Sequence, residues 1–186
     1  MIMILTKAML DDYLEEDKKA LGIRRKRPRI LLDHIWRFEI LLRKAEYHTN
    51  LHHSIRSIWY KFWYYRLGIK LGFTVPLNVC GKGLNLVHVG TVIISPYAKI
   101  GNYVRIHAGV NIGVSAGSKE APTIGDRVYI GPGAKIYGGI KIGNDVAIGA
   151  NAVVNHSFNQ DEIAIAGVPA RVINNRGSIG LLYSGI

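Results

Sequence analysis

The chain has 186 residues, of which 24 are Lys or Arg and 13 are Asp or Glu, giving a net charge of +11. This length suits one domain, or one domain with an appendage. The single cysteine, Cys80, excludes an internal disulfide and favours a reducing compartment. The positive charge favours anionic partners, but no nucleic-acid-binding motif accompanies it, so we expect no nucleic acid among them.

The first part of the chain, residues 1–72, is predicted to be α-helical. Apolar residues recur at helical spacing over residues 4–20, 33–49 and 51–67. The opening segment has too short an apolar run for a signal peptide, and no stretch approaches about 18 uninterrupted apolar residues. The sequence therefore predicts three N-terminal helices in a cytoplasmic protein.

The third predicted helix is both aromatic and basic, since residues 55–70 read IRSIWYKFWYYRLGIK. A helix of this composition is a candidate to lie on an anionic membrane surface. The alternative is that it packs against its own helical layer or against a neighbouring subunit. His48 and His52 have the i, i+4 spacing of a metal pair, but no third ligand is apparent, so we expect no metal site there.

A six-residue period governs the rest of the chain. Branched residues recur in one frame, mostly followed by Gly: Ile100, Ile106, Ile112, Ile124, Ile130, Ile136, Ile142 and Ile148. This period fits neither the 3.6-residue repeat of a helix nor the alternation of a flat sheet. Hexapeptide repeats are typical of a parallel β-helix, in which each hexad forms a short strand and a turn with the branched residue inside. Gly or Asn after that residue is expected to permit the turn conformation.

The same frame extends in both directions. It runs forward to Val154 and backward, more degenerately, with two extra residues before Ile100, through Thr74, Cys80, Leu86 and Val92. Three hexads a turn then give between four and five coils. We expect a mainly β domain over residues 73–173 and a C-terminal tail over residues 174–186. About six extra residues in VSAGSKEAPT, between two of the repeats, predict a protruding loop.

Two histidines stand out in the coils before the predicted loop, since the walls of such a coil have few polar residues to spare. His88 lies in GLNLVHVGT and His107 lies in RIHAGVNIG. Their hexads begin 106 − 86 = 20 residues apart, which is one coil of three hexads plus the two-residue insertion. The two rings are therefore expected on the same face of the coil, one rung apart.

Two segments resemble known sequences. GKGLNLVHVGTVIISPYAKIG resembles the part of serine acetyltransferases in which a Leu-Asp-His-Ala-Thr-Gly stretch contains the catalytic histidine, and His88 occupies that position. AIGANAVV followed by AIAGVPARVI resembles the last coil and tail of hexapeptide acetyltransferases. The resemblance covers roughly residues 73–173 and implies a left-handed β-helix. It also implies acetyl-CoA as cosubstrate, no metal, and a homotrimer with active sites between adjacent prisms.

Acetyl transfer to a hydroxyl suits a histidine. Imidazole, with an ordinary pKa near 6.5, can accept the hydroxyl proton as oxygen attacks the thioester and return it to the departing sulfur. We predict His88 as this general base. His107 is a candidate to assist His88, to contact the acceptor or to line a subunit seam. Cys80, first in its hexad, should face the core, which argues for direct transfer without an acetyl-cysteine intermediate.

The resemblance also implies residues that bind the cofactor. Pro132, Ala150 and Asn155 match binding positions of galactoside and maltose acetyltransferases, and Arg171 in GVPAR matches a basic residue near the nucleotide end. Lys119, in the predicted loop, is a candidate to contact the CoA phosphates. Repeat geometry alone would also require small or rigid residues at positions 132 and 150.

The chain departs from serine acetyltransferases at two positions. Val87 replaces the aspartate that helps to hold the amino acid's ammonium group, and Phe73 replaces a second aspartate that orients the histidine. A buried ammonium without a carboxylate costs on the order of several kcal/mol, and another branch of the family with this substitution acetylates sugar hydroxyls in surface polysaccharide synthesis. We therefore predict an acetyl-CoA-dependent O-acetyltransferase acting on a sugar hydroxyl, with serine O-acetylation in cysteine biosynthesis as the alternative.

The sequence disfavours two further classes of protein. A metalloenzyme like the gamma-class carbonic anhydrases would share the prism but needs three histidines across a subunit interface, and neither His88 nor His107 has a second histidine four or five residues beyond it. A non-catalytic trimeric scaffold is disfavoured by the histidine at position 88. A rise in melting temperature on addition of CoA would argue against a scaffold, because a bound ligand raises the apparent stability of the folded state.

Overall fold

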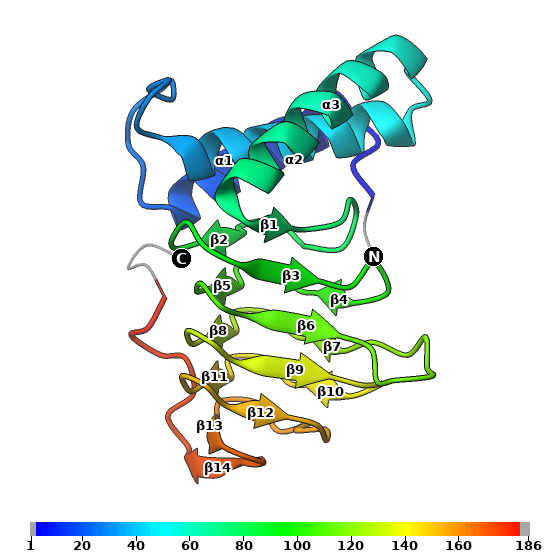
Figure 1. Ribbon diagram of the computed structural model, residues 1–186. Helices are drawn as coiled ribbons and strands as arrows, with labels where there is room; N and C mark the ends of the chain where they lie inside the picture. The colour runs from blue at the N-terminus through cyan, green and yellow to red at the C-terminus, as the bar shows by residue number, and fades with distance from the viewer. Residues whose placement is uncertain (1–2, 183–186) are drawn as a thin grey trace.

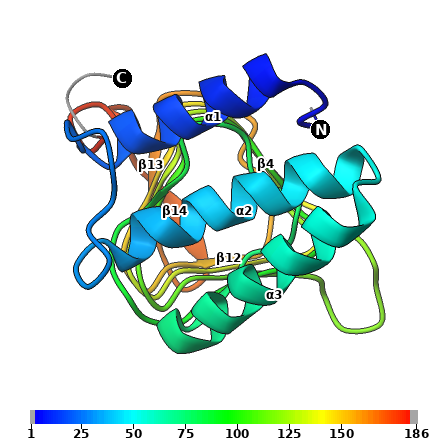
Figure 2. The ribbon, with the colours of Figure 1, turned by 90° about the horizontal axis from the view of Figure 1, so that it is seen from above.

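Three helices form a layer on top of a triangular coil of short strands in the computed structural model, which describes residues 3–182 (Figure 1). The helices are α1 (Lys7–Ala20), α2 (His34–Asn50) and α3 (Ser54–Leu71). The three predicted helices are confirmed, with bounds that agree within four residues at each end. The Thr6 hydroxyl caps α1 by accepting a hydrogen bond from the Met9 N–H. Seen from above, the helices lie across the end of the coil (Figure 2).

The strands of residues 3–182 form three walls. The first wall pairs β1 (Phe73–Thr74), β3 (Val92–Ile94), β6 (Asn111–Gly113), β9 (Lys135–Tyr137) and β12 (Val153–Val154) in that order. The second wall contains β4 (Lys99–Ile100), β7 (Thr123–Ile124) and β10 (Lys141–Ile142). The third contains β2 (Asn85–Leu86), β5 (Arg105–Ile106), β8 (Tyr129–Ile130), β11 (Ala147–Ile148), β13 (Ala164–Gly167) and the antiparallel β14 (Ala170–Asn174). Every other pairing between these strands is parallel, as the hexad repeat predicts.

The coil has five turns over the described residues and is left-handed. Isolated bridges at Cys80 and Phe158 extend the three strands of the second wall to 3 + 2 = 5 rungs, which matches the other walls. The first-wall strands run from left to right at the front of Figure 1, and Figure 2 places β4 to the right and β13 to the left. The chain therefore turns anticlockwise as it descends away from the viewer in Figure 2. This confirms the left-handed sense implied by the resemblance, against the usual right-handed crossover.

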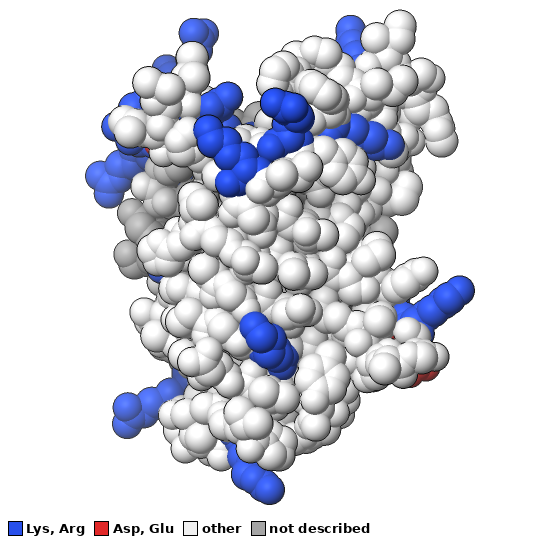
Figure 3. Space-filling model, viewed as in Figure 1, with Lys and Arg blue, Asp and Glu red and all other residues white. Residues whose placement is uncertain are grey.

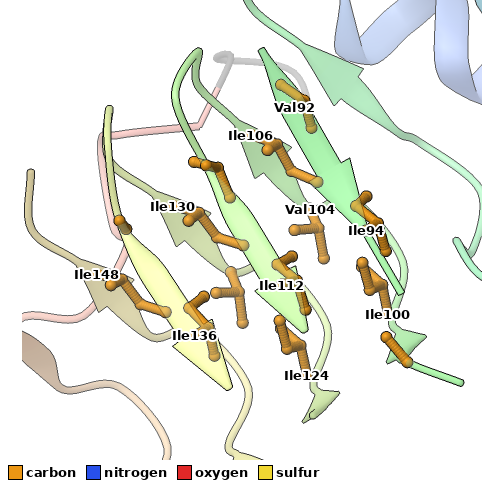
Figure 4. Packing of buried hydrophobic residues seen from close by; sticks show 14 of the residues in the cluster. Val92, Ile94, Ile100, Val104, Ile106, Ile112, Ile124, Ile130, Ile136 and Ile148 are labelled. Carbon is orange, nitrogen blue, oxygen red and sulfur yellow. The ribbon is translucent and has the colours of Figure 1, made fainter. Parts of the chain in front are cut away.

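The recurring isoleucines fill the interior of the coil. Ile106, Ile130 and Ile148 follow one another on successive rungs of the third wall, and all three are fully buried (Figure 4). Each side chain of this kind contributes roughly 1.5–3 kcal/mol when it is removed from water. Cys80 also faces the core as predicted, and burial raises the pKa of its thiol to about 12. Thr74 departs from the predicted frame, because its side chain is exposed while both neighbours are buried.

The two-residue insertion lies in a different place from the one predicted. We expected it after Val92, but strand pairing places Ile94 in line with Ile112. The interval from Leu86 to Ile94 is 94 − 86 = 8 residues, whereas the corresponding interval in the next coil is 112 − 106 = 6. The extra residues therefore lie in the turn 87–91, and this turn contains the predicted catalytic histidine.

Polar side chains of the helices form hydrogen bonds with backbone groups at the open edge of the first coil. Three helical carboxylates accept hydrogen bonds from backbone N–H groups of that coil: Asp17 from Leu84, Glu39 from Leu86 and Glu46 from Asn78. Arg43 is completely buried and donates to Asp17, Glu46 and the carbonyl oxygens of Cys80 and Gly81. Since parallel strands leave such groups unpaired at the end of a coil, these contacts fasten the helical layer to the β-helix.

A loop and the end of the chain lie outside the regular coil. The predicted loop is confirmed, since residues 114–122 project between β6 and β7 (right in Figure 1). The chain end returns along the coil, where Ser178 donates to the carbonyl oxygens of Asp145 and Arg127. Residues 183–186 of the predicted tail are outside the described part. Within residues 3–182, no helix is long and apolar enough to cross a membrane.

Candidate active site

The turns that join the third wall to the first wall stack into one edge of the coil, here called the corner column. It consists of the turns 87–91, 107–110, 131–134 and 149–152. Backbone hydrogen bonds hold these turns in register: Gly109 N–H to Thr91 O, Gly133 N–H to Ala108 O and Asn151 N–H to Pro132 O. The corner column therefore places four of the predicted site residues on successive rungs: His88, His107, Pro132 and Ala150.

His88 and His107 lie side by side at the top of the corner column. Their ring centroids are 5.8 Å apart, and the ring of Tyr129 lies 5.1 Å from that of His107. The His88 side chain is exposed to solvent, whereas His107 is half-buried. The expectation that both rings share one face, one rung apart, is confirmed. An exposed imidazole beside a second imidazole can accept a proton from a bound hydroxyl.

His107 is held in its neutral form. Burial lowers its pKa, and electrostatic interactions with Arg105 and His88 lower it further. Its Nε2 atom is buried and has no hydrogen-bond partner within residues 3–182. A neutral ring with an unpaired nitrogen can exchange a hydrogen bond with a bound acceptor or with a neighbouring imidazole.

Three predicted cofactor-binding residues continue the corner column away from the histidines. Pro132 and Ala150 are exposed on the next two rungs. The rung below them is β13, and Arg171 of β14 pairs there with Ala166. Five strand spacings of ~4.8 Å, from β2 before His88 to β14, give a track of about 24 Å from His88 to the exposed cation. The residues present therefore suit an extended thioester with a phosphate-bearing end.

The other two predicted cofactor residues lie at the opposite end of the first wall. Asn155 directly follows β12, and Lys119 is in the loop that follows β6. Glu120 of the same loop packs against Gly139, since a Cβ placed on that glycine would lie 2.5 Å from the Glu120 Oε2 atom. Within one protomer the structure does not bring Lys119 or Asn155 together with His88.

A pocket of about 220 Å³ lies beside the histidine turn, and sequence reasoning did not foresee it. Val87 and Val89 line one side of the pocket, and residues between Leu21 and Trp36 line the other. Asp33 lines the pocket and accepts hydrogen bonds from the guanidinium groups of Arg25 and Arg29. Burial alone would raise the pKa of Asp33, but the Arg29 N–H and the two guanidinium groups outweigh it and lower the pKa to about 2. The pocket therefore contains an ionised carboxylate at neutral pH.

Lys135 is a further basic residue near the corner column that the sequence did not single out. It lies on the exposed side of β9, and its Nζ atom donates to the carbonyl oxygen of Gly109 at 2.5 Å. A lysine at an outward position of a repeat is ordinarily a solvated charge, so its position beside the corner column could be recognised only from the three-dimensional arrangement.

Comparison with known proteins shows which proteins this chain resembles. Residues 121–156 match the family model "Bacterial transferase hexapeptide (six repeats)". The chain is similar to a serine acetyltransferase of Mycobacterium tuberculosis, with 45% identity over 100 residues that cover 53% of this chain and 43% of that protein. Among solved structures it resembles soybean serine acetyltransferase complexed with serine, with a TM-score of 0.72, 28% identity and coverage of 88% and 69% of the two chains. It also resembles the Brucella abortus enzyme in complex with coenzyme A, with a TM-score of 0.71, 26% identity and coverage of 92% and 70%.

These similarities correct one prediction. They show a match to a hexapeptide-repeat transferase model over residues 121–156 and similarity to serine acetyltransferases, and they give no support to the polysaccharide O-acetyltransferase branch. The sugar acceptor is therefore wrong as the leading interpretation, because relatives at 37–45% identity are named serine acetyltransferase. The sugar interpretation assumed that only position 87 could provide a carboxylate for the ammonium group of serine. In the structure, Asp33 also lines the pocket beside Val87. The matching part spans less than half of the Mycobacterium tuberculosis protein.

Proposed function

We propose that this protein is an enzyme that transfers the acetyl group of acetyl-CoA to the hydroxyl of L-serine. The observation that supports this most directly is the exposed His88 beside His107 at the top of the corner column. Proteins similar to this chain are named serine acetyltransferase, and one similar structure is a complex with coenzyme A. Because the matching part covers only a portion of those relatives, the geometry of the site is the main support for this activity.

His88 acts as the general base in the proposed reaction. It accepts the proton of the serine hydroxyl while that oxygen attacks the thioester carbonyl carbon. The carbon–sulfur bond then breaks, and the imidazolium returns the proton to the departing thiolate. The products are O-acetyl-L-serine and CoA with a free thiol. The neutral ring of His107 contacts His88 or the acceptor, and Cys80 takes no part because its thiol is buried in the core.

The corner column is the proposed track for the cofactor. Pro132 and Ala150 leave room for the pantetheine arm to lie against the backbone, and Arg171 faces the phosphates at the lower end. Lys119 and Asn155 lie at the opposite end of the first wall, so in one protomer they face a separate edge of the coil. A homotrimer, in which that edge of one protomer meets the corner column of the next, would join the two sets. Sedimentation equilibrium tests this assembly, and a mass of one chain would contradict it.

The pocket beside Val87 is the proposed acceptor site. Asp33 offers its ionised carboxylate to the ammonium of serine, and the guanidinium groups of Arg25 and Arg29 hold that carboxylate in place. This arrangement replaces the aspartate that the chain lacks at position 87. A cytoplasmic location stays a prediction, which rests on the reducing compartment favoured by a single unpaired cysteine.

The Asp33→Asn variant tests the acceptor site. Loss of a hydrogen bond to a charged group costs roughly 1.5–3 kcal/mol, so the KM for L-serine should rise by about tenfold to a hundredfold while the KM for acetyl-CoA is unchanged. Asp145→Asn is the matched control, since Asp145 forms a similar paired contact with Arg127 at another edge of the coil. Equal serine KM values in Asp33→Asn and the wild type would exclude Asp33 from the acceptor site.

The activity itself is tested by thiol release from acetyl-CoA. We expect release that depends on L-serine, with O-acetyl-L-serine identified by mass spectrometry, and no release above background with D-serine. Addition of a metal chelator should leave the rate unchanged, because the proposed steps use only protein side chains. Release that requires a sugar and does not occur with L-serine would reject the proposal.

A further inference from the structure

Helix α3 has apolar side chains on two opposite faces, and the protomer covers only one of them. Tyr64 and Leu71 on the inner face are buried. The outer face exposes residues spaced three, four or seven positions apart, here called the outer stripe: Ile55, Ile58, Trp59, Phe62 and Ile69. Their exposed fractions range from 53% to 85%. A helix that is apolar all round is normally buried, and a contiguous exposed apolar surface marks an interaction site.

The outer stripe continues into a groove of about 510 Å³. One side of the groove is the end of α3, and the other is Ile30 and Leu31, which are 72% and 80% exposed. The Arg37 side chain donates to the Ile30 carbonyl oxygen at 2.5 Å and so holds this segment beside the helix. Arg37, Arg66 and Lys70 line the groove together with its apolar residues. The groove therefore combines an apolar lining with three cations.

All the charges on α3 are positive. The helix contains Arg56, Lys61, Arg66 and Lys70 and no acidic residue, and the chain has neither Asp nor Glu from Tyr47 to Lys119. Figure 3 shows Lys and Arg side chains gathered over the helical layer at the top of the molecule. A second copy of the same stripe would bring cations against cations, which disfavours self-association through this face. The complementary partner is therefore anionic and also accepts aliphatic and aromatic side chains.

We propose that the outer stripe docks the protein on the surface of a bilayer that contains anionic phospholipids. The helix lies parallel to the membrane, with its isoleucines and Phe62 entering the boundary between headgroups and acyl chains. Trp59 lies at headgroup level, where amphipathic rings are favoured, and Arg66 and Lys70 pair with lipid phosphates. Because α3 is at one end of the molecule, the coil and its corner column extend away from the membrane (Figure 1). This inference does not depend on the proposed reaction.

Vesicle flotation tests the proposal with the full chain. Wild-type protein should float with phosphatidylcholine vesicles that contain phosphatidylglycerol, and its partition coefficient should be at least tenfold higher than on phosphatidylcholine alone. High salt should release most of the bound protein, because screening weakens attraction to the anionic surface. Equal binding to both vesicles, or no binding to either, would overturn the proposal.

Two pairs of variants separate specific docking from general charge. Arg66→Glu should lower the partition coefficient about tenfold or more, whereas Lys141→Glu, the same charge change at an exposed position of the second wall, should change it far less. Ile58→Ser should also lower it about tenfold, whereas Ile179→Ser should not, although Ile58 and Ile179 are 70% and 74% exposed. Melting temperatures within a few degrees of the wild type would show that each variant is folded.

A second copy of the chain or an acidic protein as the partner would give different results in these experiments. If the outer stripe joined two copies, Ile58→Ser and Arg66→Glu would lower the mass measured by sedimentation equilibrium without vesicles, and that result would overturn the proposal. If the partner were an acidic protein, purified wild type would not float with any vesicle. Flotation that depends on anionic lipid and on the outer stripe, at an unchanged mass, supports docking on the membrane.

Discussion

At the scale of single residues, the protonation of His107 makes the stability of the fold depend on pH. Burial keeps its pKa below the value of about 6.5 expected in the unfolded chain. As pH falls through 6.5, the unfolded state takes up this proton before the folded state does, so the contribution of His107 is present above that pH and is lost on acidification. We expect wild type to lose more stability between pH 7.5 and 5.5 than His107→Gln does.

Urea unfolding at the two pH values measures this difference. The His107→Gln variant has no titratable ring, so its unfolding midpoint should fall less on acidification than that of the wild type. An equal fall in the two proteins would mean that the ring of His107 is not held neutral by its surroundings.

The glycines of the hexads illustrate what a sequence can and cannot reveal about single residues. Their periodic position was evident, but the expected reason, a turn conformation, is not the one the structure shows. A Cβ on Gly101 or Gly125 would lie 2.5–2.6 Å from a carbonyl oxygen of the next coil, so the close stacking of coils excludes a side chain. Positive φ angles fall two residues later, on Tyr103 and Arg127. The hexad repeat alone does not distinguish these two causes.

At the scale of elements, the buried Arg43 stabilises the contact between the helices and the β-helix. It pairs with Asp17 and Glu46, and all three side chains are at most 2% exposed. Removing one partner from a buried ion-paired group costs roughly 3–5 kcal/mol, because the remaining charges lose their compensation. Arg43→Met should therefore lower the free energy of unfolding by about this amount.

Equilibrium unfolding in urea, compared with Arg127→Met, checks the role of Arg43. Arg127 also pairs with an aspartate, but this pair is partly exposed, and exposed pairs contribute less than about 1 kcal/mol. Similar destabilisation by both substitutions would show that the buried network does not fasten the helical layer to the first coil.

The elements themselves were largely predictable from spacing. A period of six identified the strands from Ile100 onward, since every later coil repeats the same buried positions. The first coil was predicted less well, because its contacts are made with the helices as well as with the next coil. Asp33 reaches the pocket beside Val87 from a distant part of the sequence, and no local pattern relates these two positions.

At the scale of the whole molecule, most of the proposed catalytic and cofactor-binding residues lie along one edge of the coil. The two histidines and two proposed cofactor positions lie on successive rungs of the corner column, and Arg171 lies beyond its lower end. The two-residue insertion lengthens the turn 87–91 at its top, beside the pocket proposed as the acceptor site. The predicted division into residues 1–72, 73–173 and 174–186, and the role of each site residue, stay predictions that require measurement.

The kinetics of His88→Ala test the central claim most directly. His88 is exposed, so its removal should leave the melting temperature nearly unchanged. At saturating acetyl-CoA and L-serine, the account predicts that kcat for O-acetyl-L-serine formation falls about a hundredfold to ten-thousandfold, while His53→Ala, at an exposed position on the helical layer, retains wild-type activity. Equal kcat values in His88→Ala and the wild type would contradict the assignment of His88 as the base.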